Sequence, residues 1–259
     1  MYLSYSYQTI VRFTQPALTH FIKLRCQPCT TPCQRIIREG FTLHPSDMHL
    51  KTGTDAFGNR IIVGSALSPH DSLSYFSSGV VELSDYRIPD DHPAPYYYID
   101  TQKTAYSSEM DVVRIDHYND QWLTAWTLCT ELHKIMAYTP LSTDTSTTAA
   151  EAFHLRRGVC QDFAHILIAL CRHRGIAARY VCGFLSGEGE THAWVEVYVG
   201  GVWRGLDPTH GIYIDYGYIK VAHGRDADDC SVSRGIYTGP ALQQTEIRVI
   251  VTPLSNSFR

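Results

Sequence analysis

The sequence predicts an α+β fold, in which an N-terminal β-sandwich precedes a core of helices packed on an antiparallel sheet. Two changes of hydrophobic period support this prediction. The first hundred residues contain short apolar runs with alternating polar residues, as expected for half-buried strands, and apolar residues recur at helical spacing from about residue 119. Strand-length apolar runs return from residue 178. We therefore predict two domains, residues 1–110 and residues 111–259.

The predicted N-terminal strands are short and are separated by turn residues. Several short strands at this spacing are typical of a sandwich. The apolar runs lie at residues 3–7, 21–24, 41–43, 60–63 and 79–83, and the turns contain Pro45, Gly58 and Pro69. The Pro-rich residues 88–95 predict a linker or crossover to the second domain.

The second domain is predicted to contain three helices and four strands. Asn119 and Asp120 precede the first helix as candidate caps, and Gly175 ends the third helix. The helices are expected at residues 122–136, 148–155 and 160–173, and the strands at residues 178–181, 192–199, 202–207 and 245–251.

Composition and charge exclude several functional classes. A chain of 259 residues with 44% hydrophobic and 19% charged residues is not collagenous or largely disordered. Its formal net charge of -4 argues against a nucleic-acid partner. No run approaches 18 apolar residues, so no membrane span is predicted. The first 25 residues lack the apolar segment of a secretory signal, and we therefore expect a cytoplasmic protein.

The chain has eight cysteines, which we expect to be free thiols in a reducing compartment. Cys26, Cys29 and Cys33 form the one tight cluster. A metal or iron–sulfur site needs a fourth ligand, and the sequence offers none at a recognisable spacing. We therefore predict no metal and no cofactor, and keep a metal-binding scaffold at these cysteines as an alternative.

Cys160 is the first candidate catalytic residue. It follows Gly158 and Val159 and opens the third predicted helix. Unpaired N–H groups and the helix dipole favour a thiolate at a helix N-terminus, so this position favours a reactive cysteine. The alternative is a buried core cysteine, the commoner role of this residue type.

His192 and Asp207 are the other two candidates. The turn residues Gly200 and Gly201 predict a hairpin that places both at the end far from the turn, close together if a bulge or bend intervenes. His192 alternates with small apolar residues and valines, which places it on the polar face of its strand. A carboxylate there would orient the imidazole and stabilise its cation. A surface histidine and a turn-forming aspartate are the alternatives.

Residues 186–191, directly before His192, contain two glycines and predict a mobile lid.

Four segments together resemble the transglutaminase-like superfamily, and more narrowly its bacterial members regarded as cysteine proteases. They are GVCQDFA at residues 158–164, GIAARYV at 175–181, HAWVEV at 192–197 and LDPT at 206–209. DAFGN at residues 55–59 resembles the β-rich N-terminal domain of the same bacterial group. The resemblance implies a papain-type core with Cys160 as nucleophile, His192 as base and Asp207 as orienting carboxylate. His210 and Cys182 replace the Asn and Ser that are usual in this group.

The expected function is cysteine-dependent hydrolysis of a peptide or isopeptide bond through a thioester, with a protein or peptide as substrate. The backbone N–H of Cys160 is the expected oxyanion donor. The same residues would also allow acyl transfer to an amine, including protein crosslinking. A third possibility is a binding module that keeps the fold without turnover.

Overall fold

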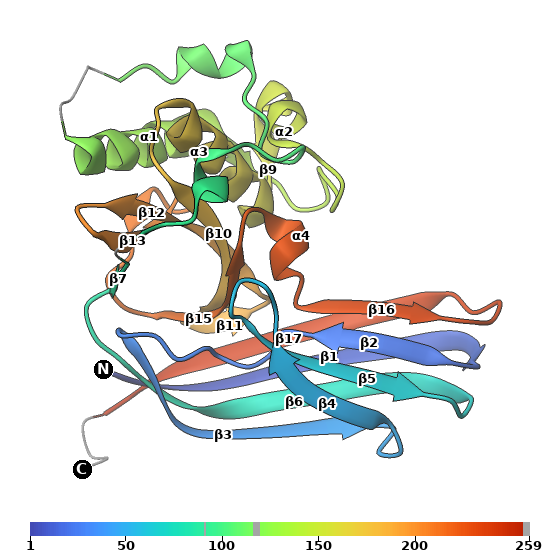
Figure 1. Cartoon of the computed structure of the whole chain (residues 1–259). Coiled ribbons are helices and arrows are strands. Elements are labelled where there is room, and N and C mark those ends of the chain that lie inside the picture. Colours follow the sequence, from blue (N-terminus) through green and yellow to red (C-terminus); the bar gives the residue numbers. More distant parts are fainter. Residues whose placement is uncertain (91, 116–119, 256–259) are drawn as a thin grey trace.

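The structure is a computed structural model that describes residues 1–90, 92–115 and 120–255. Within these residues the chain forms three antiparallel sheets, one short parallel pair of strands and a layer of helices (Figure 1). The helices lie on one side of the sheet that contains His192, and the β-rich N-terminal region lies on the other (Figure 1). The predicted α+β fold, with a β-rich N-terminal region and helices packed on antiparallel sheets, is confirmed.

The β-rich region consists of two sheets, which we call the long sheet and the outer sheet. The long sheet has the order β11-β17-β1-β6-β3, and the outer sheet has the order β16-β2-β5-β4. Their strands are β1 (Tyr2–Ala17), β2 (His20–Leu24), β3 (Gln34–His44), β4 (His49–Thr54), β5 (Arg60–Ala66), β6 (His70–Leu83), β11 (Gly187–Gly189), β16 (Ser233–Tyr237) and β17 (Gln243–Leu254).

The third sheet, which we call the core sheet, has the order β14-β13-β12-β10-β15, with β7 beside β13. Its strands are β7 (Arg87–Pro89), β10 (Ala178–Leu185), β12 (His192–Val199), β13 (Val202–Asp207), β14 (Ile212–Tyr213) and β15 (Tyr218–Gly224). The remaining elements are α1 (Gln121–Ile135), α2 (Ala149–Leu155), α3 (Cys160–His173), α4 (Ala227–Cys230), the 3-10 helices η1 (Pro95–Tyr98) and η2 (Ser108–Val112), and the parallel strands β8 (Ala137–Tyr138) and β9 (Arg157–Gly158).

The predicted caps and turns of the core are present where the structure describes them. Asp120 caps α1 by accepting hydrogen bonds from the N–H groups of Trp122 and Leu123; Asn119, the other predicted cap, lies outside the described residues. Gly200 and Gly201 both have positive φ, +62° and +79°, and join β12 to β13. Two successive positive φ angles are the geometry of a two-residue hairpin turn whose twist matches that of the strands.

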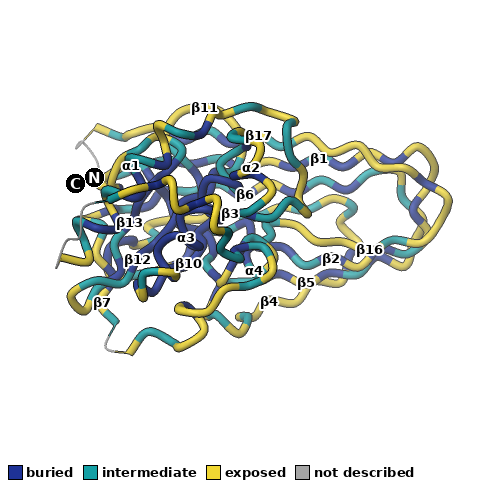
Figure 2. Tube along the Cα trace, turned by 90° about the horizontal axis from the view of Figure 1, so that it is seen from above, coloured by how far each residue is buried: buried dark blue, intermediate teal, exposed yellow. Residues whose placement is uncertain are grey.

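The long sheet supports both of its neighbours with the same face of β1. Phe13, toward one end of β1, contacts His20 and Tyr237 of the outer sheet at ring-centroid distances of 5.6 and 4.8 Å. Tyr7, nearer the other end, stacks on Phe184 of the core sheet at 5.2 Å. Figure 2 shows the buried residues gathered around α3 and β10, whereas the far ends of β1, β2 and β16 are exposed. One hydrophobic core therefore continues from the N-terminal strands into the helical layer.

The pairing of strands crosses the predicted domain boundary at residue 110 in both directions. β7, which precedes the boundary, pairs with β13, whereas β16 and β17 pair with β2 and β1. The predicted division into residues 1–110 and 111–259 therefore does not coincide with the sheets. Pairing between strands more than 200 residues apart leaves no local signal in the sequence.

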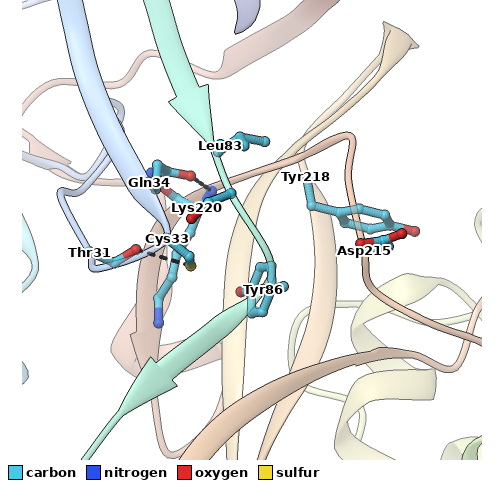
Figure 3. Close-up of a pocket in the computed structure, with 9 residues that line it drawn as sticks. Thr31, Cys33, Gln34, Leu83, Tyr86, Asp215, Tyr218 and Lys220 are labelled. Carbon is cyan, nitrogen blue, oxygen red and sulfur yellow. Dashed lines mark hydrogen bonds between the residues drawn. The ribbon is translucent and has the colours of Figure 1, made fainter. Parts of the chain in front are cut away.

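The predicted polar face of β12 is in fact buried, because the N-terminal region covers it. Glu196 has no exposed surface and pairs with Arg179 of β10 and with Lys220 of β15, whose Nζ lies 2.7 Å from the carboxylate. Tyr86 donates a further hydrogen bond of 2.6 Å to Glu196. Gln34 of β3 exchanges two hydrogen bonds of 2.8 Å with the backbone of Lys220. Both residues line a small hollow, which Figure 3 shows.

This network shifts the pKa values of its members in a consistent way. Burial alone would raise the pKa of Glu196, but Arg179 and Lys220 hold it well below its ordinary value. Burial lowers the pKa of Lys220, and Glu196 acts against that shift. A buried carboxylate between two cations therefore connects β10, β12 and β15.

None of the helices in the described residues is both long enough and apolar enough to span a membrane.

We expect Glu196→Gln to destabilise the fold by about 3–5 kcal/mol, because it leaves two buried cations without their carboxylate. Urea unfolding monitored by tryptophan fluorescence measures the change. Glu246→Gln is the matched control, since it removes an exposed carboxylate paired with Arg12, and is expected to change stability by less than about 1 kcal/mol. Equal losses in the two variants would contradict a stabilising role of the buried network.

Candidate active site

Cys160 is held at the start of α3 by the chain that precedes it. The Asp162 carboxylate accepts a hydrogen bond of 2.7 Å from the N–H of Val159 and one of 2.6 Å from the hydroxyl of Thr143. A Cβ added at Gly158 would lie 2.6 Å from this carboxylate, so the close approach requires glycine at that position. The first N–H groups of α3 have no intrahelical acceptor and lie at the turn that carries the thiol.

Cys160 is the one cysteine of the eight that is partly exposed; the structure describes all of them and assigns no disulfide. Burial raises the pKa of each of the other seven thiols, to about 12 for Cys171 and Cys182. Their sulfur atoms are therefore both shielded and protonated at neutral pH. Cys160 is therefore the cysteine that a reagent in solution can reach most directly.

The hairpin brings His192 and Asp207 into direct contact. His192 Nε2 lies 2.7 Å from Asp207 Oδ2. The last paired residues of β12 and β13 are Val195 and Leu206, so the next step along each strand places Asp207 across from Trp194. His192 lies two residues further on the same face, and a diagonal contact results without a bulge. The expected proximity of the two residues is confirmed.

Asp207 has three side-chain partners, two of which were not assigned from the sequence. His210 Nδ1 and the Tyr218 hydroxyl each lie 2.7 Å from Oδ2. The N–H of Thr209 donates a bond of 2.9 Å to Oδ1. Burial alone would raise the pKa of Asp207, but these hydrogen bonds and the charge of His192 lower it well below its ordinary value. The Pro-Thr-His turn predicts His210 near the carboxylate, whereas Tyr218 arrives from a separate strand and has no local signal.

The imidazole of His192 lies between Asp207 and Cys160. Burial lowers its pKa, but the hydrogen bond with Asp207 and the interactions with Cys160 act more strongly together and raise the pKa to about 9. Because this pKa is above the ordinary value of about 6.5, the imidazolium stabilises the folded state fully below pH 6.5. That contribution is lost as the pH rises through 9.

Cys160 and His192 line a common open cavity of about 710 Å³. One wall is formed by the segment that was predicted to be a mobile lid. Residues Gly187–Gly189 form strand β11 instead, which pairs with Val249–Val251 of β17 in the long sheet. Arg248 of β17 also pairs with Glu188 at 2.7 Å. The segment directly before His192 is thus attached to the β-rich region.

The three clustered cysteines do not form a common site. Cys29 Sγ lies 3.5 Å from the carbonyl oxygen of Lys220, and Cys33 Sγ lies 3.3 Å from the hydroxyl of Thr31. Among the described residues, the group with ligand atoms suited to a metal is His192, Asp207 and His210, whose ligand atoms lie within 4.8 Å of one another. Oδ2 of Asp207 already contacts both imidazoles at 2.7 Å, so hydrogen bonds account for this arrangement.

Comparisons with known proteins agree with this architecture. Residues 116–208 match the transglutaminase-like superfamily, and residues 3–82 match the bacterial transglutaminase-like N-terminal region. An uncharacterized protein of Mycobacterium leprae is 29% identical over 268 residues, covering 94% of this chain and 95% of that protein. One of Mycobacterium tuberculosis is 26% identical over 294 residues, covering 96% and 91%. The crystal structure of a proposed cysteine protease from Cytophaga hutchinsonii has a similar fold, with a TM-score of 0.79 at 20% identity and coverage of 99% and 93%.

We expect iodoacetamide to modify Cys160 before any other cysteine below pH 8, because the other thiols are buried. His192→Ala should slow this reaction about tenfold or more, since the imidazolium that stabilises a thiolate is lost. Mass spectrometry of the modified peptides measures both rates. His154→Ala changes an exposed histidine paired with Glu109 and serves as the control. Modification of a second cysteine at a comparable rate would argue against selective activation.

We expect Asp207→Asn to lower the pKa of His192 from about 9 to below 6.5, because burial still opposes the charged imidazole while the carboxylate is gone. An NMR titration of the histidine ring nitrogens measures this shift. Asp226→Asn replaces another buried aspartate, which caps α4, and should leave the pKa of His192 unchanged. A His192 pKa that stays near 9 in Asp207→Asn would refute the assignment of its cause.

Proposed function

We propose that this chain, a member of the transglutaminase-like superfamily with the bacterial transglutaminase-like N-terminal region, is a cysteine-dependent hydrolase of amide bonds. The observation that supports the proposal most directly is the contact of 2.7 Å between His192 and Asp207, at a cavity that also exposes Cys160. A thiol, an imidazole and a carboxylate in this order form the arrangement that activates a cysteine nucleophile.

In the proposed first step, His192 holds the proton of Cys160 and the thiolate attacks an amide carbonyl carbon. The negative charge that develops on the carbonyl oxygen is stabilised by the N–H of Cys160 at the start of α3, where the helix dipole adds to the effect. Asp207 keeps its charge throughout and stabilises the imidazolium. Loss of one oxyanion donor would raise the barrier by roughly 3–4 kcal/mol.

The tetrahedral intermediate then breaks down to a thioester. His192 gives its proton to the leaving amine and becomes neutral, so it can next accept a proton from water. The water attacks the thioester carbon as His192 takes its proton. The carbon–sulfur bond then breaks, the acid is released, and the proton remains shared between His192 and Cys160. The open cavity around Cys160 gives water access to the thioester, so hydrolysis can complete the cycle.

The proposed substrate is a peptide or protein, and the proposed location remains the cytoplasm. The peptide substrate follows from the amide chemistry of the proposed triad and from the resemblance to cysteine proteases, and the open cavity beside Cys160 leaves room for a peptide segment. The location rests on the sequence alone, and fractionation of the native host with an antibody against the chain tests it.

We expect a thioester on Cys160 to be trapped when the protein turns over a quenched fluorogenic peptide library. Acid quenching and intact-protein mass spectrometry detect the adduct, and hydroxylamine should remove it. Cys160→Ala and His192→Gln should each lower kcat by about 1,000-fold or more. The control is His154→Gln. A product that contains an added primary amine, formed in preference to the free acid, would replace hydrolysis by acyl transfer, and turnover by Cys160→Ala would exclude the nucleophile.

A further inference from the structure

A second hollow, of about 360 Å³, adjoins the cavity that exposes Cys160. The two spaces have five lining residues in common. They come from the loop before α2, the first turn of α3, strand β10 and the position directly before His192, and they are Thr145, Gln161, Tyr180, Cys182 and Thr191. The cleft therefore extends past the thiol rather than ending there.

The far side of this second hollow belongs to the β-rich region. Its buried, mostly apolar floor comes from strands of the long and outer sheets, through Tyr7, Val11, Ile22 and Leu73. Its rim comes from the strands that return to those sheets from the C-terminal part of the chain, through Ser233, Gln243 and Thr245. The core and the β-rich region thus each supply one side.

The second hollow differs from the first in charge. Its lining, as far as the structure describes it, contains no aspartate, glutamate, lysine or arginine. His20 is its one histidine, and burial together with neighbouring His70 lowers the pKa of His20 to about 4, so the ring is neutral at pH 7. The cavity around Cys160, by contrast, includes Glu188 and Glu190. A charged side chain that entered the second hollow would lose water without gaining a partner charge.

We propose that the second hollow is a substrate subsite, formed jointly by the core and the β-rich region, which takes an uncharged and largely apolar side chain of a peptide bound at Cys160. This inference rests on the proposed function and names its substrate class. Because the two spaces adjoin and share five lining residues, a peptide bound at Cys160 can extend from one into the other. Binding sites of roughly 300–1,000 Å³ usually combine apolar walls with a few polar groups.

Strand β17 offers a matched pair of substitutions. Thr245 lines the hollow and is exposed, so Thr245→Trp fills the space without removing a core side chain. Gln244 is the adjacent exposed residue, and its side chain points to the opposite face of the strand. Gln244→Trp therefore adds the same bulk outside the hollow. Gln243→Trp is a second filling variant on the Thr245 face, for use if Thr245→Trp does not fold.

The probes are four-residue peptides that alkylate a thiol by displacement of chloride. One set has a C-terminal chloromethyl ketone and the other an N-terminal chloroacetyl group, so the peptide extends to either side of the reacting carbon. In each set one position varies among Phe, Asp and Lys. Mass spectrometry measures the rate of Cys160 alkylation. Iodoacetamide is too small to occupy the second hollow while it reacts at Cys160, so its rate measures the reactivity of the thiol alone.

We expect a Phe-containing probe to alkylate Cys160 at least about tenfold faster than the matching Asp and Lys probes, since a buried charge lacks compensation. Thr245→Trp should remove this preference, Gln244→Trp should retain it, and neither should change the iodoacetamide rate. Equal rates for charged and apolar probes, or a preference unaffected by Thr245→Trp, would overturn the subsite. Failure of iodoacetamide to select Cys160 would instead count against the proposed function, because that reaction does not involve the hollow.

Discussion

The buried carboxylate of Asp207 is the group on which the candidate site depends. It has no exposed surface, and its hydrogen-bond partners are two imidazoles, one phenol and backbone N–H groups, with no lysine or arginine among them. A negative charge buried in this way needs a nearby cation, and protonated His192 supplies it. The same interaction that stabilises the carboxylate thus keeps His192 protonated beside the thiol. The strand register that sets this contact is therefore as important as the residues themselves.

A second buried carboxylate, Glu196 on the strand that begins at His192, connects the site to the β-rich region. Trp194 donates a hydrogen bond of 2.9 Å to the hydroxyl of Tyr86, which in turn donates to Glu196. His192, Trp194 and Glu196 alternate along one face of β12, so one row of side chains extends from the imidazole to the charged network. Burial of this face by the N-terminal strands makes every polar atom in it require a partner. The site and its support are consequently one polar layer.

The sequence predicts the parts of this arrangement that are local. The helix from Cys160 to His173 and the hairpin at Gly200 follow from apolar spacing and turn residues, and the family resemblance adds which residues meet. Sequence reasoning could not predict that residues 243–254 pair with β1, or that Tyr218 donates to Asp207, because both depend on strands that are distant in the chain. The burial of the polar face of β12 likewise has no local signal in the sequence. The alternation of polar and apolar residues along β12 is the same whether its polar face contacts water or is covered by other strands.

On the proposed function, the arrangement separates reactivity from selectivity within one chain. The thiol, the imidazole and the carboxylate all come from residues 160–207, within the region that matches the superfamily. The floor of the second hollow comes from strands before residue 80, and its rim from strands after residue 230. On the proposed function, substitutions in these outer strands would change which peptide is bound while the contact between His192 and Asp207 stays intact. The pairing of β11 with β17 fixes the position of β17 relative to His192. The residues proposed for catalysis and those proposed for selectivity are therefore different but are held by connected strands.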